Sequence, residues 1–148
     1  MKKIIVGLTL LLSLASFTAF ARGEEEVSKE ILLSFKNEFK TAENVSWTVA
    51  DEIATASFNL NGFRVQAYFD EDGQLLGTAR NILFEQLPIN VINALNNRFA
   101  AAPVYEIVEY NRGAETFYCM RVETAKNNLK IRATTSGYIS IDKKIKKQ

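Results

Sequence analysis

The chain has 148 residues, a near-neutral net charge of +1, no histidine and a single cysteine. Without histidine it cannot use a Ser-His-Asp or Cys-His catalytic arrangement or a histidine-based zinc site. The lone Cys119 excludes an internal disulfide and a thiolate zinc cluster. The balanced charge gives no reason to expect nucleic acid as a partner. Binding modules and enzymes that work through carboxylates alone remain possible.

The N-terminal segment is typical of a secretory signal. Two lysines precede an apolar run from Ile4 to Phe17, and Ala19-Phe20-Ala21 supplies a small-x-small cleavage site. The run is short for a membrane-spanning helix, which needs about 20 residues. We therefore expect cleavage after Ala21, with residues 22–148 forming a single domain in the periplasm or outside the cell. No stable membrane insertion is expected after cleavage.

The first part of this domain reads as one helix followed by strands. Ser28 is the expected N-cap of a helix whose apolar stripe is Ile31, Leu32, Phe35 and Phe39. Period-two alternation then predicts strands at 45–49, 54–60, 63–69 and from 75 onward. Asn61-Gly62 predicts a tight hairpin because both positions tolerate positive φ. Trp47, at the change from helix to sheet, is expected in the core.

The second part repeats this order. Leu87-Pro88 predicts a helix start with proline in the first turn, followed by the stripe Val91, Ile92, Leu95 and Phe99. Strands are predicted at 105–110, 116–123, 129–134 and 138–141. The turns between them are expected at Asn111-Arg112-Gly113, Asn127-Asn128 and Ser136-Gly137.

The two parts correspond in register. Phe35 and Phe39 match Leu95 and Phe99 at an offset of 60, and Gly73 matches Gly137 at an offset of 64. The predicted fold class is α+β: a tandem repeat of an α-β-β-β-β unit, about 28–84 and 85–148. The repeats would form one antiparallel sheet of about eight strands with two helices on one face. Chance similarity of two amphipathic units is the alternative.

The ordered motifs resemble those of the beta-lactamase-inhibitor-like, PepSY-like family of exported bacterial proteins. They are Phe35-x3-Phe39-x2-Ala42-x-Asn44-Val45-x-Trp47, Ala56-x-Phe58, Tyr68-Phe69-Asp70-x-Asp72-Gly73-x-Leu75-Leu76 and Leu87-Pro88. The resemblance implies a tandem α/β repeat with a concave sheet, and in the inhibitor that names the family this face grips a target protein. Unlike that inhibitor, this chain cannot form a disulfide, and it shows no recognisable target-contacting motif.

The side chains opposite the apolar positions form the candidate binding site. Alternation places these partner-binding candidates on the open sheet face: Arg64, Gln66, Tyr68, Arg121, Lys130 and Arg132. The neighbouring positions Thr55, Ser57, Asn59 and Phe117 would join them. Arginine and tyrosine are enriched at protein-binding hot spots. A one-sided sheet shows polar residues to solvent in any case, so the pattern alone fits a merely solvated face equally well.

Three other features have two interpretations each. Cys119 is expected to be a buried apolar residue, although the register that exposes Arg121 would put it on the open face. The acidic turn at Asp70 and Asp72 is expected to be structural, with a weak cation site as the alternative. The calcium-loop pattern fails there, because its closing position is Asn81. The basic tail from Lys143 is expected to be a frayed end, with an electrostatic contact site as the alternative.

The sequence therefore favours an exported, non-catalytic binding module that engages a protein or peptide through the open sheet face, with no cofactor and no metal. A small-ligand or cation carrier is the alternative. A hydrolase that uses paired carboxylates is less favoured, because no pair of acidic residues stands out.

Overall fold

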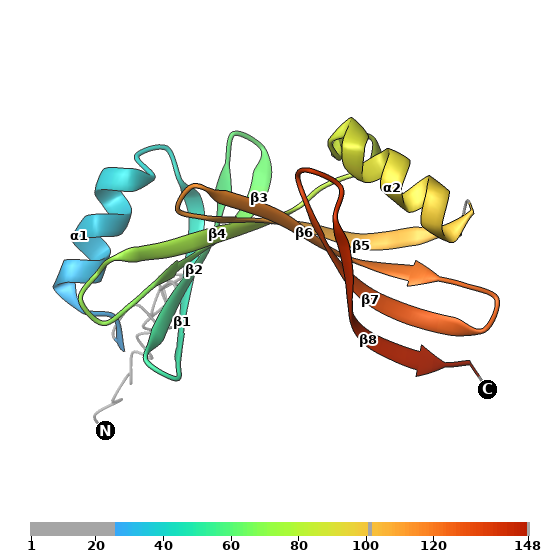
Figure 1. Cartoon of the computed structure of the whole chain (residues 1–148). Coiled ribbons are helices and arrows are strands. Elements are labelled where there is room, and N and C mark those ends of the chain that lie inside the picture. The colour runs from blue at the N-terminus through green and yellow to red at the C-terminus, as the bar shows by residue number, and fades with distance from the viewer. Residues whose placement is uncertain (1–25, 101, 148) are drawn as a thin grey trace, which may run out of the picture.

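The computed structural model describes residues 26–100 and 102–147. It is one antiparallel sheet of eight strands in sequence order, with α1 and α2 near opposite ends of the sheet (Figure 1). The predicted cleavage site after Ala21 lies outside the described residues. Over the part that is described, no helix is long and apolar enough to cross a membrane.

The elements alternate as one helix and four strands, twice over. They are α1 (Lys29–Glu38), β1 (Glu43–Ala50), β2 (Ile53–Leu60), β3 (Phe63–Phe69), β4 (Leu75–Asn81), the 3-10 helix η2 (Phe84–Gln86), α2 (Ile89–Phe99), β5 (Val104–Arg112), β6 (Glu115–Glu123), β7 (Asn127–Thr134) and β8 (Ile139–Lys146). This arrangement confirms the α+β class. The duplication of one ancestral unit stays a prediction.

The first helix covers the first four strands through an aromatic cluster. The Ser28 side chain accepts a hydrogen bond from the amide of Ile31, as expected of an N-cap. The ring of Phe35 lies 5.2 Å from Trp47 and 5.0 Å from Phe58, both edge-on. Trp47 is 3% exposed, which confirms its place in the core.

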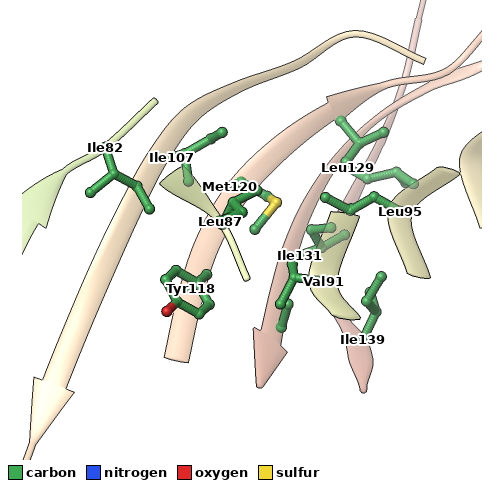
Figure 2. Packing of buried hydrophobic residues seen from close by; sticks show 12 residues of the cluster. Ile82, Leu87, Val91, Leu95, Ile107, Tyr118, Met120, Leu129, Ile131 and Ile139 are labelled. Carbon is green, nitrogen blue, oxygen red and sulfur yellow. The ribbon is translucent and has the colours of Figure 1, made fainter. Parts of the chain in front are cut away.

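The second helix covers the last four strands through an aliphatic cluster. Val91 and Leu95 of α2 lie among strand side chains that include Met120, Leu129 and Ile131 (Figure 2). Pro88 was predicted to open this helix, but it occupies the N-cap with extended ψ of 143°, and the helix begins at Ile89. The proline amide is not needed at either position.

Both clusters lie on the same face of the sheet. Residues directly opposite one another on paired strands share a face, and one such row is Val65, Arg80, Glu109, Tyr118 and Ala133. Val65 belongs to the first cluster, and Tyr118 and Ala133 belong to the second. The prediction of two helices on one face is therefore correct.

The two clusters are separated by a polar seam over β4 and β5. Arg80 Nε donates to Glu109 Oε1 at 2.7 Å, and the Glu109 side chain is only 13% exposed. Thr116 Oγ1 donates to Asn111 Oδ1 at 2.7 Å beside this ion pair. The halves are thus joined mainly by strand pairing and polar contacts, each half having its own apolar core.

The turns and the chain end follow the sequence signals with two exceptions. Asn61 and Gly62 have φ of 50° and 84° and form the expected hairpin turn. At Gly137 a Cβ would lie 2.6 Å from the carbonyl oxygen of Asn90, so the β7–β8 turn packs closely on α2. Asn127 and Asn128 were predicted as a turn, but they begin β7 and the chain reverses before them. They pair with Lys146 and Ile145 of β8, and this pairing holds their backbone extended.

The basic tail is the second exception. Lys143, Lys144 and Lys146 belong to β8 and pair with β7, so the prediction of a frayed end is wrong for these residues. Ladder hydrogen bonds to β7 continue past the last buried residue of β8, Ile139. Charged side chains along an edge strand discourage pairing with other chains.

Strand β5 contains a bulge that changes which residues face the core. The register shifts between Tyr105 and Val108, and Glu106 has a positive φ of 51°. Val104 and Ile107 therefore both face the helices, and Val108 and Tyr110 face the opposite side. This shift determines the composition of the candidate site.

Candidate functional site

The face of the sheet away from the helices, here called the open face, is defined by its register rows. One row is Ser57, Gln66, Ala79, Tyr110, Phe117 and Thr134. The next is Asn81, Val108, Cys119, Arg132 and Ser140. A third is Tyr105, Arg121, Lys130 and Lys143. Residues far apart in sequence thus become neighbours on one surface.

All six predicted partner-binding residues lie on the open face. Arg64, Gln66 and Tyr68 alternate with the buried residues of β3. Tyr68 donates a hydrogen bond to Gln66 Oε1 at 3.1 Å, and Gln66 Nε2 donates to Ser57 Oγ at 3.4 Å. These bonds hold the polar group of the first half in place.

The remaining three predicted residues lie in the second half of the face. Arg121 pairs with Glu106 at 2.6 Å, and Arg132 pairs with Asp142 at 3.3 Å. Both pairs are exposed, and such pairs contribute little to folding stability. The two guanidinium groups can therefore exchange these partners for other carboxylates at small cost. Lys130 is exposed between them on β7.

An aromatic cluster connects the two halves. The rings of Tyr110 and Phe117 are stacked, with centroids 5.1 Å apart and an interplanar angle of 8°. The guanidinium of Arg132 lies over the Phe117 ring at 5.2 Å. Burial, and then the neighbouring Tyr110, raise the pKa of Tyr68 above its ordinary value. The Tyr68 hydroxyl is thus neutral at physiological pH, as a tyrosine with an ordinary pKa of about 10 already is.

Three hollows on the open face share lining residues. The aromatic hollow, about 310 Å³, is lined by Tyr68, Leu76, Tyr110 and Phe117 among others. The central hollow, about 470 Å³, includes Tyr110, Cys119, Arg121 and Lys130. The basic groove, about 220 Å³, includes Arg121, Lys130, Lys143 and Ile145. Together they form a track across the face from β4 to β8.

Cys119 belongs to this track and not to the core. The structure places Tyr118, Met120 and Val122 inward, so the prediction of a buried core cysteine is wrong. Cys119 is half-buried opposite Val108 and Arg132. Burial raises the pKa of its thiol, although Arg132 acts in the opposite direction. A thiol in this state is a poor nucleophile.

Tyr110, Leu76 and Val108 are lining residues that the sequence reasoning missed. Strict alternation from Val104 would have turned Tyr110 toward the helices. The bulge at Glu106 shifts the alternation by one residue and turns it outward. The available signal was the spacing of the apolar residues in β5, because Val104 and Ile107 are three residues apart and cannot share one face of a regular strand.

The acidic turn behaves as a structural turn. Asp70 Oδ1 accepts a hydrogen bond from the amide of Gln74 at 2.7 Å, and the Asp70 carbonyl accepts one from Gly73 at 3.1 Å. These bonds are those of an aspartate-stabilised turn. Within residues 26–100 and 102–147, no group of three or more His, Cys, Asp or Glu side chains is placed to hold a metal.

The fold is that of several solved bacterial structures. A DUF2874 family protein from Bacteroides ovatus is 20% identical with a TM-score of 0.71, covering 81% of this chain and 87% of that one. A BLIP-like protein from Bacteroides fragilis is 18% identical with a TM-score of 0.71, covering 82% and 89%. A Bacteroides eggerthii protein provisionally described as periplasmic is 17% identical with a TM-score of 0.70, covering 81% and 88%.

The similarity at these identities concerns the fold. It agrees with the motif resemblance, since a BLIP-like protein is among the similar structures. No protein-family profile matches the chain, and no curated protein matches it in sequence.

Proposed function

We propose that this protein is an exported, non-catalytic binding module that engages a protein or peptide partner through the open face. The observation that supports it best is the aromatic cluster of Tyr68, Tyr110 and Phe117 with Arg132 stacked on it. A merely solvated face needs neither stacked rings nor a hollow. Tyrosine and arginine in such a setting are the residue types that dominate protein-binding energy.

The tyrosine and cysteine side chains in the hollows of this face are held in their neutral forms, which suits a binding surface. Burial is the first cause of the raised pKa values of Tyr68, Tyr110 and Cys119. A nucleophile or general base needs its conjugate base to be populated near neutral pH. Groups held neutral are suited to hydrogen bonding and packing.

We also propose that the protein is exported and that it consists of two copies of one unit. The N-terminal signal pattern and the structural likeness to a protein provisionally described as periplasmic support a periplasmic or secreted location. The turns at Gly73 and Gly137 each approach the first turn of their own helix, at Glu30 and Asn90. This agreement supports two copies of one PepSY-like unit, about 28–84 and 85–148.

The test is capture of a partner by the exported protein. The immobilised protein is exposed to envelope extract of the source organism, beside the variant Arg64→Ala/Tyr68→Ala/Arg132→Ala. We expect the wild type to retain a protein that the variant loses by about tenfold or more, because hot-spot side chains are removed. The thermal midpoint should fall only slightly, because Arg64 is exposed, Tyr68 is only half-buried and the Arg132–Asp142 pair is weak.

A matched control changes two cations and one large side chain on the exposed side of α1. Lys29→Ala/Leu33→Ala/Lys36→Ala removes these groups away from the open face, where Leu33 is 62% exposed. This variant should capture as the wild type does. Equal capture by all three proteins would refute the use of the open face.

A further inference from the structure

The second half of the open face has a row of cations. Arg121 of β6 lies opposite Lys130 of β7, and Lys130 lies opposite Lys143 of β8. Side chains in such pairs have Cβ atoms about 5 Å apart, and like charges so placed destabilise the sheet. Glu106 pairs with Arg121, but within the described residues no carboxylate pairs with Lys130 or Lys143. An anionic group at this row would relieve the repulsion.

The cationic row is connected to the aromatic hollow. Lys130 and Arg121 line both the basic groove and the central hollow, and Tyr110 lines both the central and the aromatic hollow. A ligand that follows this track meets positive charge over β7 and β8 and apolar surface over β4 to β6. It must therefore combine an anionic part with an apolar part.

The Phe117 ring in the aromatic hollow is poorly placed to stack on a sugar. Sugars bind aromatic rings through an open ring face. The Phe117 ring is stacked against Tyr110, and the Arg132 guanidinium also lies over it. The hollow is completed by Leu76 and the backbone at Gly77. The cationic row is also short, whereas proteins that bind anionic polymers such as nucleic acids contact many successive charges.

From this arrangement we infer that the partner presents an acidic peptide segment. Its carboxylates contact Lys130 and Lys143, and an aromatic or large aliphatic side chain of the same segment enters the aromatic hollow. This inference depends on the proposed function, because it specifies the chemistry of the partner that the open face engages.

Binding of defined peptide pools tests the inference. Four labelled pools of short peptides are measured by fluorescence anisotropy against the exported protein: acidic with aromatic residues, acidic with serine, neutral with aromatic residues, and basic with aromatic residues. We expect the acidic-aromatic pool to bind about tenfold or more tightly than each other pool, since both parts of the track are then used. Polygalacturonate is included as an anionic polysaccharide.

Charge reversal at the row provides the variant. Lys130→Glu/Lys143→Glu should weaken binding of the acidic-aromatic pool by about tenfold or more and strengthen binding of the basic-aromatic pool. The control Lys144→Glu/Lys146→Glu makes the same charge change in β8, where Lys144 lies opposite Leu129 and faces the helix side. It should bind as the wild type does, and circular dichroism checks that both variants are folded.

Each other outcome overturns the inference. Equal binding of the acidic-serine pool removes the role of the aromatic hollow, and equal binding of the neutral pool removes the role of the cations. Tighter binding of polygalacturonate would assign the track to a polysaccharide. If no pool binds, an acidic peptide partner is refuted as well. The proposed function is tested separately, and it fails if the Arg64→Ala/Tyr68→Ala/Arg132→Ala variant captures envelope proteins as the wild type does.

Discussion

At the scale of single residues, the open face depends on side chains held by a few specific contacts. Phe117 lies between Tyr110 and Arg132, and Gln66 connects Tyr68 with Ser57. On the helix side, Tyr118 is buried beside the Arg80–Glu109 pair. Burial, followed by the negative charge of Glu109, raises the pKa of Tyr118 above its ordinary value.

The raised pKa of Tyr118 predicts loss of stability at alkaline pH. The folded state holds the phenol proton more tightly than the unfolded chain, in which tyrosine has a pKa of about 10. This contribution to stability is complete below about pH 10 and is lost as pH rises through the folded-state pKa. Tyr118→Phe should therefore flatten the fall of the thermal midpoint above pH 10.

The control for this prediction is the same change at an exposed tyrosine. Tyr138 is 70% exposed, so Tyr138→Phe should leave the alkaline fall as steep as in the wild type. Parallel curves for the wild type and Tyr118→Phe would contradict the assignment.

At the scale of elements, the bulge in β5 is the feature on which the site depends most. Glu106 is the inserted residue, and its positive φ places Ile107 in the core and Tyr110 on the open face. The same insertion turns Glu109 toward Arg80. A single extra residue therefore supplies both a lining residue of the aromatic hollow and the ion pair of the polar seam.

Deletion of Glu106 should be severely destabilising. A one-residue shift would reverse the faces of the bulged strand, bringing Ile107 out and Tyr110 in on one side of the deletion. We expect a loss of more than about 4 kcal/mol in the free energy of unfolding, or no folded protein, by chemical denaturation. Glu106→Gly keeps the bulge, and it should change stability by no more than about 1 kcal/mol. A deletion variant as stable as Glu106→Gly would disprove this role.

At the scale of the whole molecule, two cores with separate helices are joined at β4 and β5. The joint has four register pairs, from Thr78 with Asn111 to Asn81 with Val108. The open face continues across this joint, since the aromatic hollow is lined from both strands. Its shape therefore depends on how closely the halves approach.

Gly77→Ala should loosen the joint while leaving both cores intact. An added Cβ would lie 2.5 Å from the carbonyl oxygen of Asn111, so β4 and β5 would have to separate. We expect a loss of about 1–3 kcal/mol in stability from this overpacking. Amide hydrogen exchange should become faster at Arg80 and Glu109, which form a hydrogen-bonded pair across the joint, with little change at Ala56 of β2 and Ala67 of β3. Unchanged exchange at the joint would contradict this account.

The sequence by itself determined the helices, the number of strands and the faces of β2, β3 and β7. In these elements polar and apolar residues alternate without interruption, and burial then follows from position alone. The positions of Arg64, Tyr68, Lys130 and Arg132 on one surface could be predicted for that reason. Their role in binding remains a proposal.

Only the tertiary structure decided which residues meet on that surface. The neighbours of Cys119 and Tyr110 depend on the register of their strands, which is set by long-range pairing with the partner strands. In β5 the bulge also interrupts the two-residue period. The strand extending through Lys146 depends likewise on ladder bonds to β7. Local pattern specifies which way a side chain points, but contacts between distant strands specify what it lies beside. The charge row and the aromatic hollow are consequences of those contacts.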